Sequence, residues 1–459
     1  MDEYKLGSST TTDEYAYIAK KGLTKRLVGE LSASKNEPEW MREERLKALT
    51  IYESLTTPEW GADLSELKWD EIHYYLKSVE RPYQDWKEVP SDVKRVFDAI
   101  GVPEAEREHL SGVTGQYDSE KIYGSLKKSL STKGVVFLSM DEGLREYPEI
   151  VKKYWGSVVP AGDNKLAALN TAVWSGGSFV YVPRGVEVKL PLQAYFRINA
   201  ENAGQFERTM IVVEEGASVN YVEGCSAPAY SSASLHSAVV EVIVKKGAKC
   251  RYTTVQNWYK NVYNLVTKRA EVGEKGRMEW VDCNIGSCVT MKYPACLLKG
   301  EGSSGSMLSI AVAGSEQQQD TGAKMYHLAP NTSSEIISKS ISKNGGRASY
   351  RGLVMISPNA AGAKSKVVCD ALILDPESRS DTYPTNRVMT NDAQLEHEAY
   401  ASKVSEEETE YLMSRGMTEG EAQTMIVRGF LGEVIDELPM EYAVELNRLV
   451  KVEMEGRGG

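Results

Sequence analysis

The fold is decided by runs such as SAVVEVIV (237–244), RMEWVDC (277–283) and VVCDALIL (367–374), which recur through the stretch from Thr171 to Asp375. Other runs of the same kind are CRYTTVQNW (250–258), CLLKG (296–300), MLSIAVAG (307–314), SEIISKSI (334–341) and SYRGLVMI (349–356). Gly, Asn, Pro or Ser residues bound each run, and no helix-length segment with a 3.6-residue apolar period interrupts them. The stretch therefore predicts a mainly β fold.

The larger turn clusters of this stretch recur about every 27 residues without repeating in sequence. They are KKGAK (245–249), GEKGR (273–277), KGEGSSG (299–305) and APNTSS (329–334). A β-helix has such a period, because each coil spends a few strands and turns and then stacks on the previous coil, about 4.8 Å along the axis. We therefore expect a right-handed parallel β-helix. A large β-sandwich, which would give a similar pattern strand by strand, is the alternative.

Length and charge restrict the class of protein. The 459 residues are enough for two or three structural units with a full core. The formal net charge of −11 argues against nucleic acid as the main partner, since binding phosphates needs clustered Lys and Arg. No apolar run reaches the roughly 18 residues of a membrane span, and the polar, acidic start MDEYKLGSSTTTDEY is unlike a signal peptide. We expect a cytoplasmic protein with no nucleic-acid or membrane partner.

The cysteines are six in number, with no C-x-x-C pair among them. They are Cys225, Cys250, Cys283, Cys288, Cys296 and Cys369. This distribution suggests neither a disulfide framework nor a zinc knuckle, so free thiols in a reducing compartment are the simplest interpretation. Cys283 and Cys288 have opposite strand parity, and we interpret them, with Cys296, as structural.

The flanks of the β stretch have helical patterns. The N-terminal flank includes NEPEWMREERLKALTIYESL (36–55), with Pro38 at the expected first helical position, and SDVKRVFDAIGVP (91–103), with an apolar 3.6-residue period. We divide the chain into an N-terminal helical region (1–130), a β-helix core with a short entry helix (131–393) and a C-terminal helical region (394–459).

The C-terminal region has two capping boxes, Ser405 with Glu408 and Thr418 with Glu421, ahead of an apolar stripe. The stripe consists of Ala422, Met425, Ile426, Phe430 and Val434, and Pro439 opens a last helix. An apolar face so near the chain end either binds a partner protein or docks on the end of the β-helix.

Four segments together resemble the SufB/SufD family of the Suf iron–sulfur cluster assembly machinery, and its SufB members in particular. They are EPEWMREERLKAL (37–49), VPSDVKRVFDAIGVPEAEREHLSGVTGQYDSEKIY (89–123), WSGGSFVYVPRGVEVKLPLQAYFRIN (174–199) and RGMTEGEAQTMIVRGFLGEVIDELP (415–439). Family members often carry a short cysteine cluster in the N-terminal region. This chain has none, so no role of that cluster applies here.

The resemblance implies a scaffold, not an enzyme, on which sulfur and iron are assembled into a transient iron–sulfur cluster for apoproteins. It implies a SufBCD-type complex, with a SufC-type ABC ATPase bound at Met425, Ile426 and Phe430, and a dimer with SufD or a second SufB. A cysteine desulfurase or other donor would supply sulfur. The chain lacks G-x-x-x-x-G-K-[ST], so nucleotide binding would belong to the ATPase partner.

Cys225 is the first candidate site residue. A cysteine between Gly and Ser is more often inert than reactive when judged from sequence alone, but the resemblance implies that Cys225 receives sulfur. Cys250 follows about one coil later, so the two thiols are expected on neighbouring coils.

A second group of polar residues is associated by the resemblance with an interior path for sulfur: Arg197, Asn199, Gln256, Trp258 and Lys268. In strands, Gln256 and Trp258 would share one face, and so would Arg197 and Asn199. Faces directed inward would give the β-helix a polar lining. Solvent-exposed side chains are the alternative.

Cys369 and the QLEHEA run form the third candidate. Cys369 and Glu396 are separated by one coil of the expected period, so we expect them to stack about 5 Å apart. Thiolate, imidazole and carboxylate are ligands that ferrous iron accepts. In a strand, Glu396 and Glu398 would share a face and His397 would point away. The resemblance implies a nascent cluster held by Cys369 first, Glu398 second and then His397.

The distance between the two main thiols predicts a conduit. Cys225 and Cys369 are separated by roughly five coils, or about 25 Å along the axis. Two alternatives to the SufB interpretation remain: a SufD-like structural paralogue of the same complex and a β-helix enzyme acting on polysaccharides.

Overall fold

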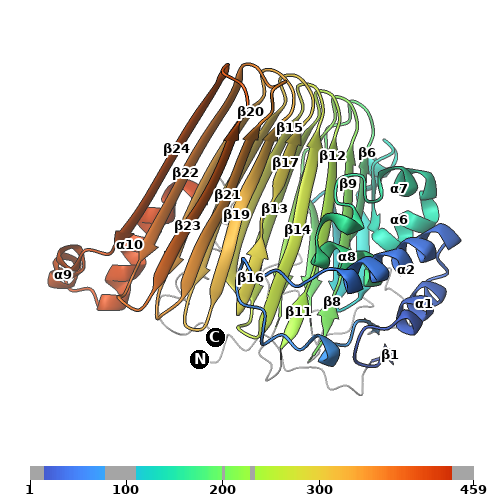
Figure 1. Ribbon diagram of the computed structural model, residues 1–459, viewed down its shortest axis with the longest axis horizontal. Helices are drawn as coiled ribbons and strands as arrows, with labels where there is room; N and C mark the ends of the chain where they lie inside the picture. The colour runs from blue at the N-terminus through green and yellow to red at the C-terminus, as the bar shows by residue number, and fades with distance from the viewer. Residues whose placement is uncertain (1–14, 78–109, 199–201, 228–232, 437–459) are drawn as a thin grey trace.

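The computed structural model describes residues 15–77, 110–198, 202–227 and 233–436. Its centre is a parallel β-solenoid of about seven turns, flanked by N- and C-terminal helices (Figure 1). The helix predicted within 91–103, the helix predicted from Pro439 and the path residue Asn199 lie outside the described residues.

Two sheets form the walls of the solenoid, and the chain visits them alternately. The first sheet contains β3 (Gly112–Tyr117), β4 (Glu120–Leu126), β7 (Leu192–Arg197), β10 (Ser218–Ser226), β13 (Lys249–Trp258), β15 (Arg277–Gly286), β18 (Ser304–Ala313), β20 (Ser333–Ser342), β22 (Ala363–Ile373) and β24 (Ala393–Lys403). The second contains β5 (Val136–Ser139), β6 (Ser178–Val182), β8 (Gly204–Gln205), β9 (Arg208–Val213), β11 (Ser234–His236), β12 (Val239–Val244), β14 (Val262–Val272), β16 (Val289–Lys292), β17 (Ala295–Leu298), β19 (Gln318–His327), β21 (Arg347–Ile356) and β23 (Arg379–Val388). Parallel pairing from β6 and β7 onward confirms the β-helix and excludes the sandwich.

The coils differ in length, which the sequence period did not show. Cys225 pairs with Gln256, Gln256 with Asn284 and Asn284 with Ala311, so the coil that starts at Cys225 is the longest of these three and the next two are successively shorter. The predicted turn clusters do lie between strands. Gly247 takes a φ of 64° in KKGAK, in the left-handed region where a residue without Cβ is least strained.

The core fills the space between the two sheets with alternate side chains of each strand. An apolar row on the first sheet runs through Tyr221, Tyr252, Trp280, Met307, Ile336 and Val367, each paired with the next. The Tyr221–Tyr252 and Tyr252–Trp280 ring centroids are 4.8 and 5.3 Å apart. Burying side chains of this size stabilises the fold by about 1.5–3 kcal/mol each, so this row fixes the stacking of the coils.

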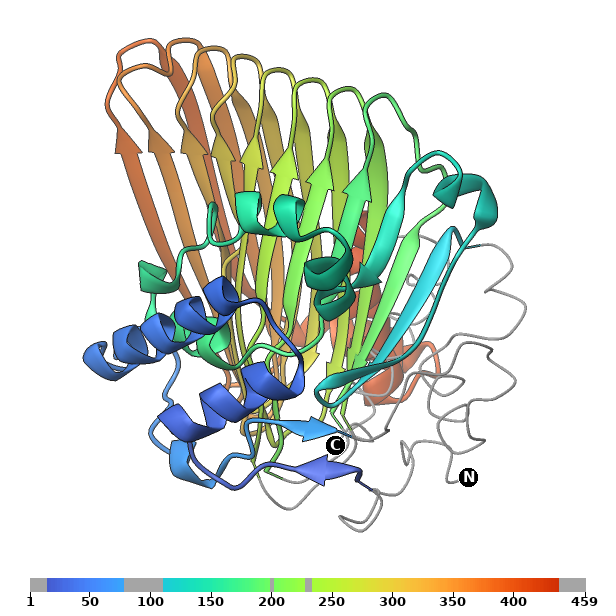
Figure 2. The same cartoon turned by 90° about the vertical axis from the view of Figure 1, so that its right-hand side faces the viewer.

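The N-terminal helices cover the outer face of the second sheet along its early strands (Figures 1 and 2). They are α1 (Lys25–Ser34), α2 (Glu39–Ser54), α6 (Met140–Glu146), α7 (Pro148–Tyr154) and α8 (Lys165–Val173), with α5 (Lys128–Ser131), η2 (Trp69–Glu71) and η4 (Ala161–Asp163) as short turns. Arg45 of α2 is fully buried, binds Glu37 and donates to the backbone oxygens of Ala172 and Trp174, which ties α2 to α8.

The predicted division of the chain is wrong at two places. Residues 112–126 form the hairpin β3–β4, which extends the first sheet, so residues 1–130 are not wholly helical; the short pair β1 (Tyr17–Ile18) and β2 (Leu76–Lys77) also lies there. Strand β24 continues the β-solenoid to Lys403, past the predicted boundary at 394. Its side chains are mostly exposed, so no apolar alternation marked it.

The C-terminal helices begin after β24. They are α9 (Glu406–Ser414) and α10 (Glu419–Asp436). The Oγ atom of Ser405 accepts from the Glu408 N–H, and Thr418 and Glu421 form the reciprocal bonds of a capping box, as the sequence predicts. Within the described residues, no helix is both long enough and apolar enough to cross a membrane.

Candidate functional site

Cys225 lies inside the solenoid near the end of β10. It is 4% exposed, and its Sγ donates to Oε1 of Glu223, 3.5 Å away. Glu223 is two residues earlier on the same strand and therefore shares the inner face. The Tyr252 hydroxyl donates to the other oxygen of Glu223, and the Lys268 ammonium lies 3.6 Å from Oε1. The thiol thus belongs to a buried ionic network.

A second carboxylate approaches the same thiol from the other wall. Glu207 lies just before β9. One of its carboxylate oxygens is within 4.8 Å of a carboxylate oxygen of Glu223 and of the Cys225 sulfur. Its Oε1 is 2.7 Å from Nε2 of His236, whose Nδ1 is 2.8 Å from Oδ1 of Asn264. Sequence reasoning missed Glu207, Glu223, His236 and Asn264. Only Glu223 had a local signal, its same-face spacing from Cys225.

The electrostatics keep this thiol protonated at neutral pH. Burial raises the pKa of Cys225 well above its usual value, and the charges of Glu223 and Glu207 raise it further. Burial, with Glu223 nearby, also raises the pKa of Glu207 to about 7. Burial would lower the pKa of Lys268, but Glu223 and Asp282 outweigh it and the pKa is raised, so Lys268 stays a cation. Any reaction of Cys225 requires a partner that removes its proton.

Three of the predicted path residues do lie inside the solenoid. Gln256 pairs with Cys225 and accepts a hydrogen bond from Asn264, 2.8 Å long. The Trp258 ring packs on His236, with ring centroids 4.8 Å apart. Lys268 projects from β14 and donates to Thr254. These residues are buried, which excludes the solvent-exposed alternative for them.

Arg197 does not share the face of Cys225. The register partner of Cys225 on β7 is Phe196, whereas Arg197 pairs with Ser226. Alternation along β7 and β10 therefore places Arg197 on the opposite face of the sheet, where it is also buried.

Cys225 and Cys250 lie on neighbouring coils, as predicted, on the adjacent strands β10 and β13, but they are not side by side. Cys250 pairs with Val219, which lies near the start of β10, about 20 Å from Cys225 at strand rise. The coil that begins at Cys225 is longer than the assumed period and closes only at Gln256. Cys283 faces the outer apolar cluster, and Cys296 the interior at the level of Ala270.

A polar row connects the surroundings of Cys225 to Cys369. On the inner face of the first sheet, successive strands pair Glu223 with Thr254, Asp282, Ser309, Ser338 and finally Cys369. From β10 to β22 this is five strand spacings, about 24 Å, in agreement with the predicted separation.

The second sheet contributes cations that face this row. Lys268 and Lys292 lie 3.7 and 3.3 Å from the two oxygens of Asp282. Several buried polar atoms beside the row find no hydrogen-bond partner within the described part of the chain: Gln256 Nε2, Asn284 Oδ1, Ser309 Oγ and Gln319 Oε1. Such groups are rare in closed cores and occur where an interior takes up water or polar cargo.

Cys369 is buried at the end of the row. Burial raises the pKa of its thiol to about 12, an effect partly offset by the Tyr350 hydroxyl. Its register partner on β24 is Ala399, whereas Glu396 pairs with Lys366. The predicted stacking of Glu396 on Cys369 is therefore wrong.

The Glu396–His397–Glu398 run alternates across β24. Glu396 pairs with Lys366 and Glu398 with Val368, on the outer face, whereas His397 pairs with Val367 and takes the inner face of Cys369. The Nε2 atom of His397 has no hydrogen-bond partner among the described residues. Geometry therefore puts His397, not Glu398, beside Cys369.

The C-terminal stripe is partly core. Helix α10 packs on the outer face of the first sheet through Val427, Leu431, Val434 and Ile435, against residues from Val255 on β13 to Leu372 on β22. Ile426 and Phe430 lie at the edge of this contact, and Lys339 donates to the Phe430 backbone oxygen at 2.8 Å. Met425 is 48% exposed. The helix thus docks on a sheet face and not on the end of the β-helix.

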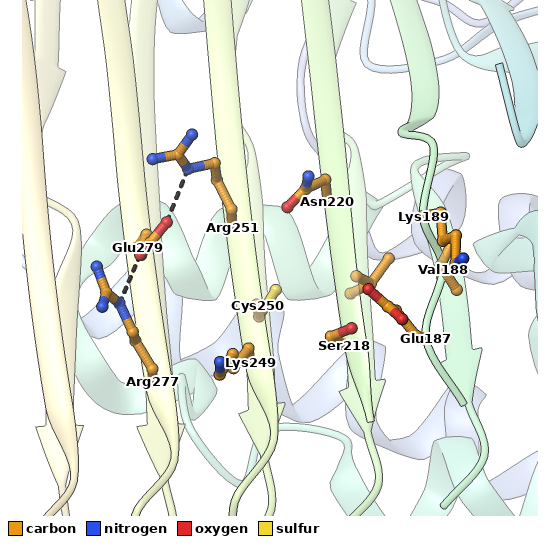
Figure 3. Close-up of a pocket in the computed structure, with 11 residues that line it drawn as sticks. Glu187, Val188, Lys189, Ser218, Asn220, Lys249, Cys250, Arg251, Arg277 and Glu279 are labelled. Carbon is orange, nitrogen blue, oxygen red and sulfur yellow. Dashed lines mark hydrogen bonds and ion pairs between the residues drawn. The ribbon is translucent and has the colours of Figure 1, made fainter. Parts of the chain in front are cut away.

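A groove of about 320 Å³ opens on the outer face of β10, β13 and β15. Figure 3 shows Glu279 between Arg251 and Arg277, with ion pairs of 2.7 and 2.5 Å. Cys250 lies beneath it with a pKa raised by burial. Glu279 is engaged by both arginines of this groove, and neither Cys225 nor Cys369 lines it.

Comparisons with known proteins cover the chain. Residues 196–430 match the SufBD core domain of SUF-system FeS cluster assembly, and residues 32–194 match the SufBD protein N-terminal region. Iron–sulfur cluster assembly SufBD family proteins of Staphylococcus haemolyticus, Staphylococcus epidermidis and Staphylococcus aureus are 59% identical to it over 459 residues, covering 100% of this chain and 98% of each relative. The chain therefore belongs to the SufBD family of SUF-system iron–sulfur cluster assembly proteins.

Proposed function

We propose that this chain is a SufB-type scaffold, on which sulfur accepted at Cys225 and iron are assembled into a cluster at Cys369. The observation that carries the proposal is the shared inner face: both thiols lie on it, and a polar row with Lys268 and Lys292 beside it spans the five strand spacings between them. Cationic side chains suit the passage of an anionic sulfur species.

The iron–sulfur cluster is cargo in this proposal. Cys369 and His397 offer a thiolate and an imidazole from one face, fewer ligands than a cluster needs. β24 and β23 end their sheets within the described residues, so unpaired strand edges lie next to this pair. We propose that a SufD subunit or a second copy of this chain pairs there and completes the ligand set.

The remaining partners follow from the same proposal. A SufC-type ABC ATPase would bind the exposed side of α10 around Met425, a cysteine desulfurase or another donor would supply sulfur, and apoproteins would receive the cluster. We propose that the chain works in the cytoplasm and has no ATPase activity of its own.

A SufD-like structural paralogue is the second candidate. The burial of Cys225 and Cys369, which keeps both thiols protonated, favours it. A polysaccharide-acting enzyme has no support from the family.

Anaerobic cluster reconstitution tests the scaffold role, followed by visible and Mössbauer spectra. Cys225→Ser should block assembly driven by a cysteine desulfurase but spare assembly from free sulfide, because only the first route needs the acceptor thiol. Cys369→Ser should impair both routes. Cys250→Ser, a matched buried thiol away from the row, should impair neither. If Cys225→Ser and Cys369→Ser behave alike in both assays, the division of roles is wrong.

A further inference from the structure

Side chains from three segments, β10, the residue before β9 and β11, gather around Cys225 and have the chemistry of a metal site. We propose that Cys225, Glu223, Glu207 and His236 form a buried site for one divalent metal ion of borderline softness. The site is separate from Cys369 and His397, which lie about 24 Å away at strand spacing. The identity of the physiological ion as ferrous iron rests on the proposed scaffold function. The existence of the metal site does not depend on that function.

The distances suit a tetrahedral ion after a small adjustment. Metal–sulfur and metal–oxygen or metal–nitrogen bonds of about 2.3 and 2.0–2.1 Å place ligand atoms about 3.4–3.6 Å apart. The Cys225 sulfur is already 3.5 Å from Oε1 of Glu223. The ligand atoms of Glu207, Glu223 and Cys225 all lie within 4.8 Å of one another. His236 is outside that group and contacts it through Glu207, 2.7 Å away, so both the Glu207 side chain and the His236 ring would have to rotate to close the set.

The hydrogen bonds of His236 prepare it as a ligand. Asn264 donates through Nδ2 to Gln256, so its Oδ1 faces Nδ1 of His236 as an acceptor, at 2.8 Å. A ring proton therefore sits on Nδ1, and a second proton is shared between Nε2 and the Glu207 carboxylate, where a metal ion would displace it. Nε2 points to the Glu207 carboxylate, 2.7 Å away. A histidine that donates its far N–H to an oxygen while its other nitrogen faces the site has the arrangement of metal-bound histidines.

The charges also call for a cation. Glu207 is 1% exposed, and its Oε2 has no hydrogen-bond partner in the part of the chain that the structure describes. A buried, unpaired carboxylate oxygen is costly. One divalent ion, together with the Lys268 ammonium 3.6 Å from Glu223, would balance the three negative charges of the thiolate and the two carboxylates. Thiolate and imidazole ligands select iron, cobalt or zinc over magnesium or calcium.

Cobalt(II) binding to the full-length Cys369→Ser chain, without oxygen or sulfide, tests the site. We expect one cobalt per chain and a thiolate-to-cobalt charge-transfer band that excess magnesium does not displace. Cys225→Ser should abolish the band, and Glu207→Gln, which keeps the side-chain volume, should weaken cobalt binding at least ten-fold. Cys250→Ser is the matched control and should leave both unchanged.

Several outcomes would overturn the proposal: no band in the Cys369→Ser chain, a band that persists in Cys225→Ser, or unchanged cobalt affinity in Glu207→Gln. Circular dichroism of each apo variant checks the fold, and if Cys225→Ser does not fold, the Glu207→Gln titration decides. Because sulfide is absent, failure here is distinguishable from failure of the scaffold proposal, which cluster reconstitution tests.

Discussion

Cys225 and Cys369 lie on one face of one sheet but in different surroundings. Cys225 is enclosed by charge of both signs, with Glu223 on its own strand and Glu207 and Lys268 from the opposite wall. Cys369 lies one strand from the end of the sheet, and its inner-face neighbour there is His397. The first site is complete within one chain, whereas the second offers half a ligand set at an edge. Under the proposed function, this contrast would assign chemistry within the chain to Cys225 and assembly between chains to Cys369.

The largest effect that would test this contrast is on stability. Lys268→Met should lower the free energy of unfolding by about 3–5 kcal/mol, because it leaves Glu223 and Asp282 buried without their shared cation. Denaturant unfolding measures it. Lys246→Met removes an ion pair of the same type from the solvent-exposed surface and should change little. Equal losses of unfolding free energy in the two variants would mean that the buried ionic network at Cys225 stabilises the fold no more than a surface ion pair does.

The next effect concerns the ATPase partner. Met425→Asp should weaken SufC-type ATPase binding about thirty-fold, roughly 2 kcal/mol, since it charges the exposed side of α10. Met389→Asp, at a methionine exposed to 49% after β23, is the control for binding by calorimetry. If Met425→Asp still bound the ATPase with unchanged affinity, the exposed side of α10 would not be the binding surface.

A smaller effect separates the two candidate ligands beside Cys369. His397→Ala should lower iron retention by a reconstituted dimer about ten-fold, because His397 takes the inner face of Cys369. Glu398→Ala should have less effect, because Glu398 takes the outer face. Iron analysis after gel filtration compares them. A larger loss in Glu398→Ala would restore the order implied by family resemblance.

The parts of this site that depend on local rules could be predicted from the sequence. Strand alternation correctly put Gln256 with Trp258 and separated His397 from Glu396 and Glu398. Turn clusters indicated the coiled architecture. Register could not be obtained this way, because the length of a coil varies with its turns. The misplaced pair, Cys369 with Glu396, comes from a fixed period.

Contacts between the two walls were also beyond the sequence. Glu207 reaches Cys225 from the residue before β9, and His236 of β11 contacts Glu207. Nothing in the local pattern of either residue relates it to a thiol on β10. Only the closed solenoid brings them together.

The smallest effect is a pH dependence that belongs to the Cys225 site alone. Burial and Glu223 raise the pKa of Glu207 from 4.5 to about 7, so the folded chain holds a proton there that the unfolded chain releases. The stability from this proton is fully present below pH 4.5 and is lost as pH rises through about 7.

Glu207→Gln removes this titration, so its stability relative to the wild type should increase by about 1 kcal/mol between pH 6 and pH 7.5. Chemical unfolding at fixed ionic strength across that range measures the difference. Glu142 is the matched control because its pKa is lowered: burial alone would raise it, but Lys121 and the Ser139 cap outweigh burial. The stability that Glu142 contributes is therefore lost only in acid, and Glu142→Gln should show a flat difference in this window. A flat difference for Glu207→Gln as well would mean that Glu207 is already ionised beside Cys225, and that the buried charge is balanced without a shared proton.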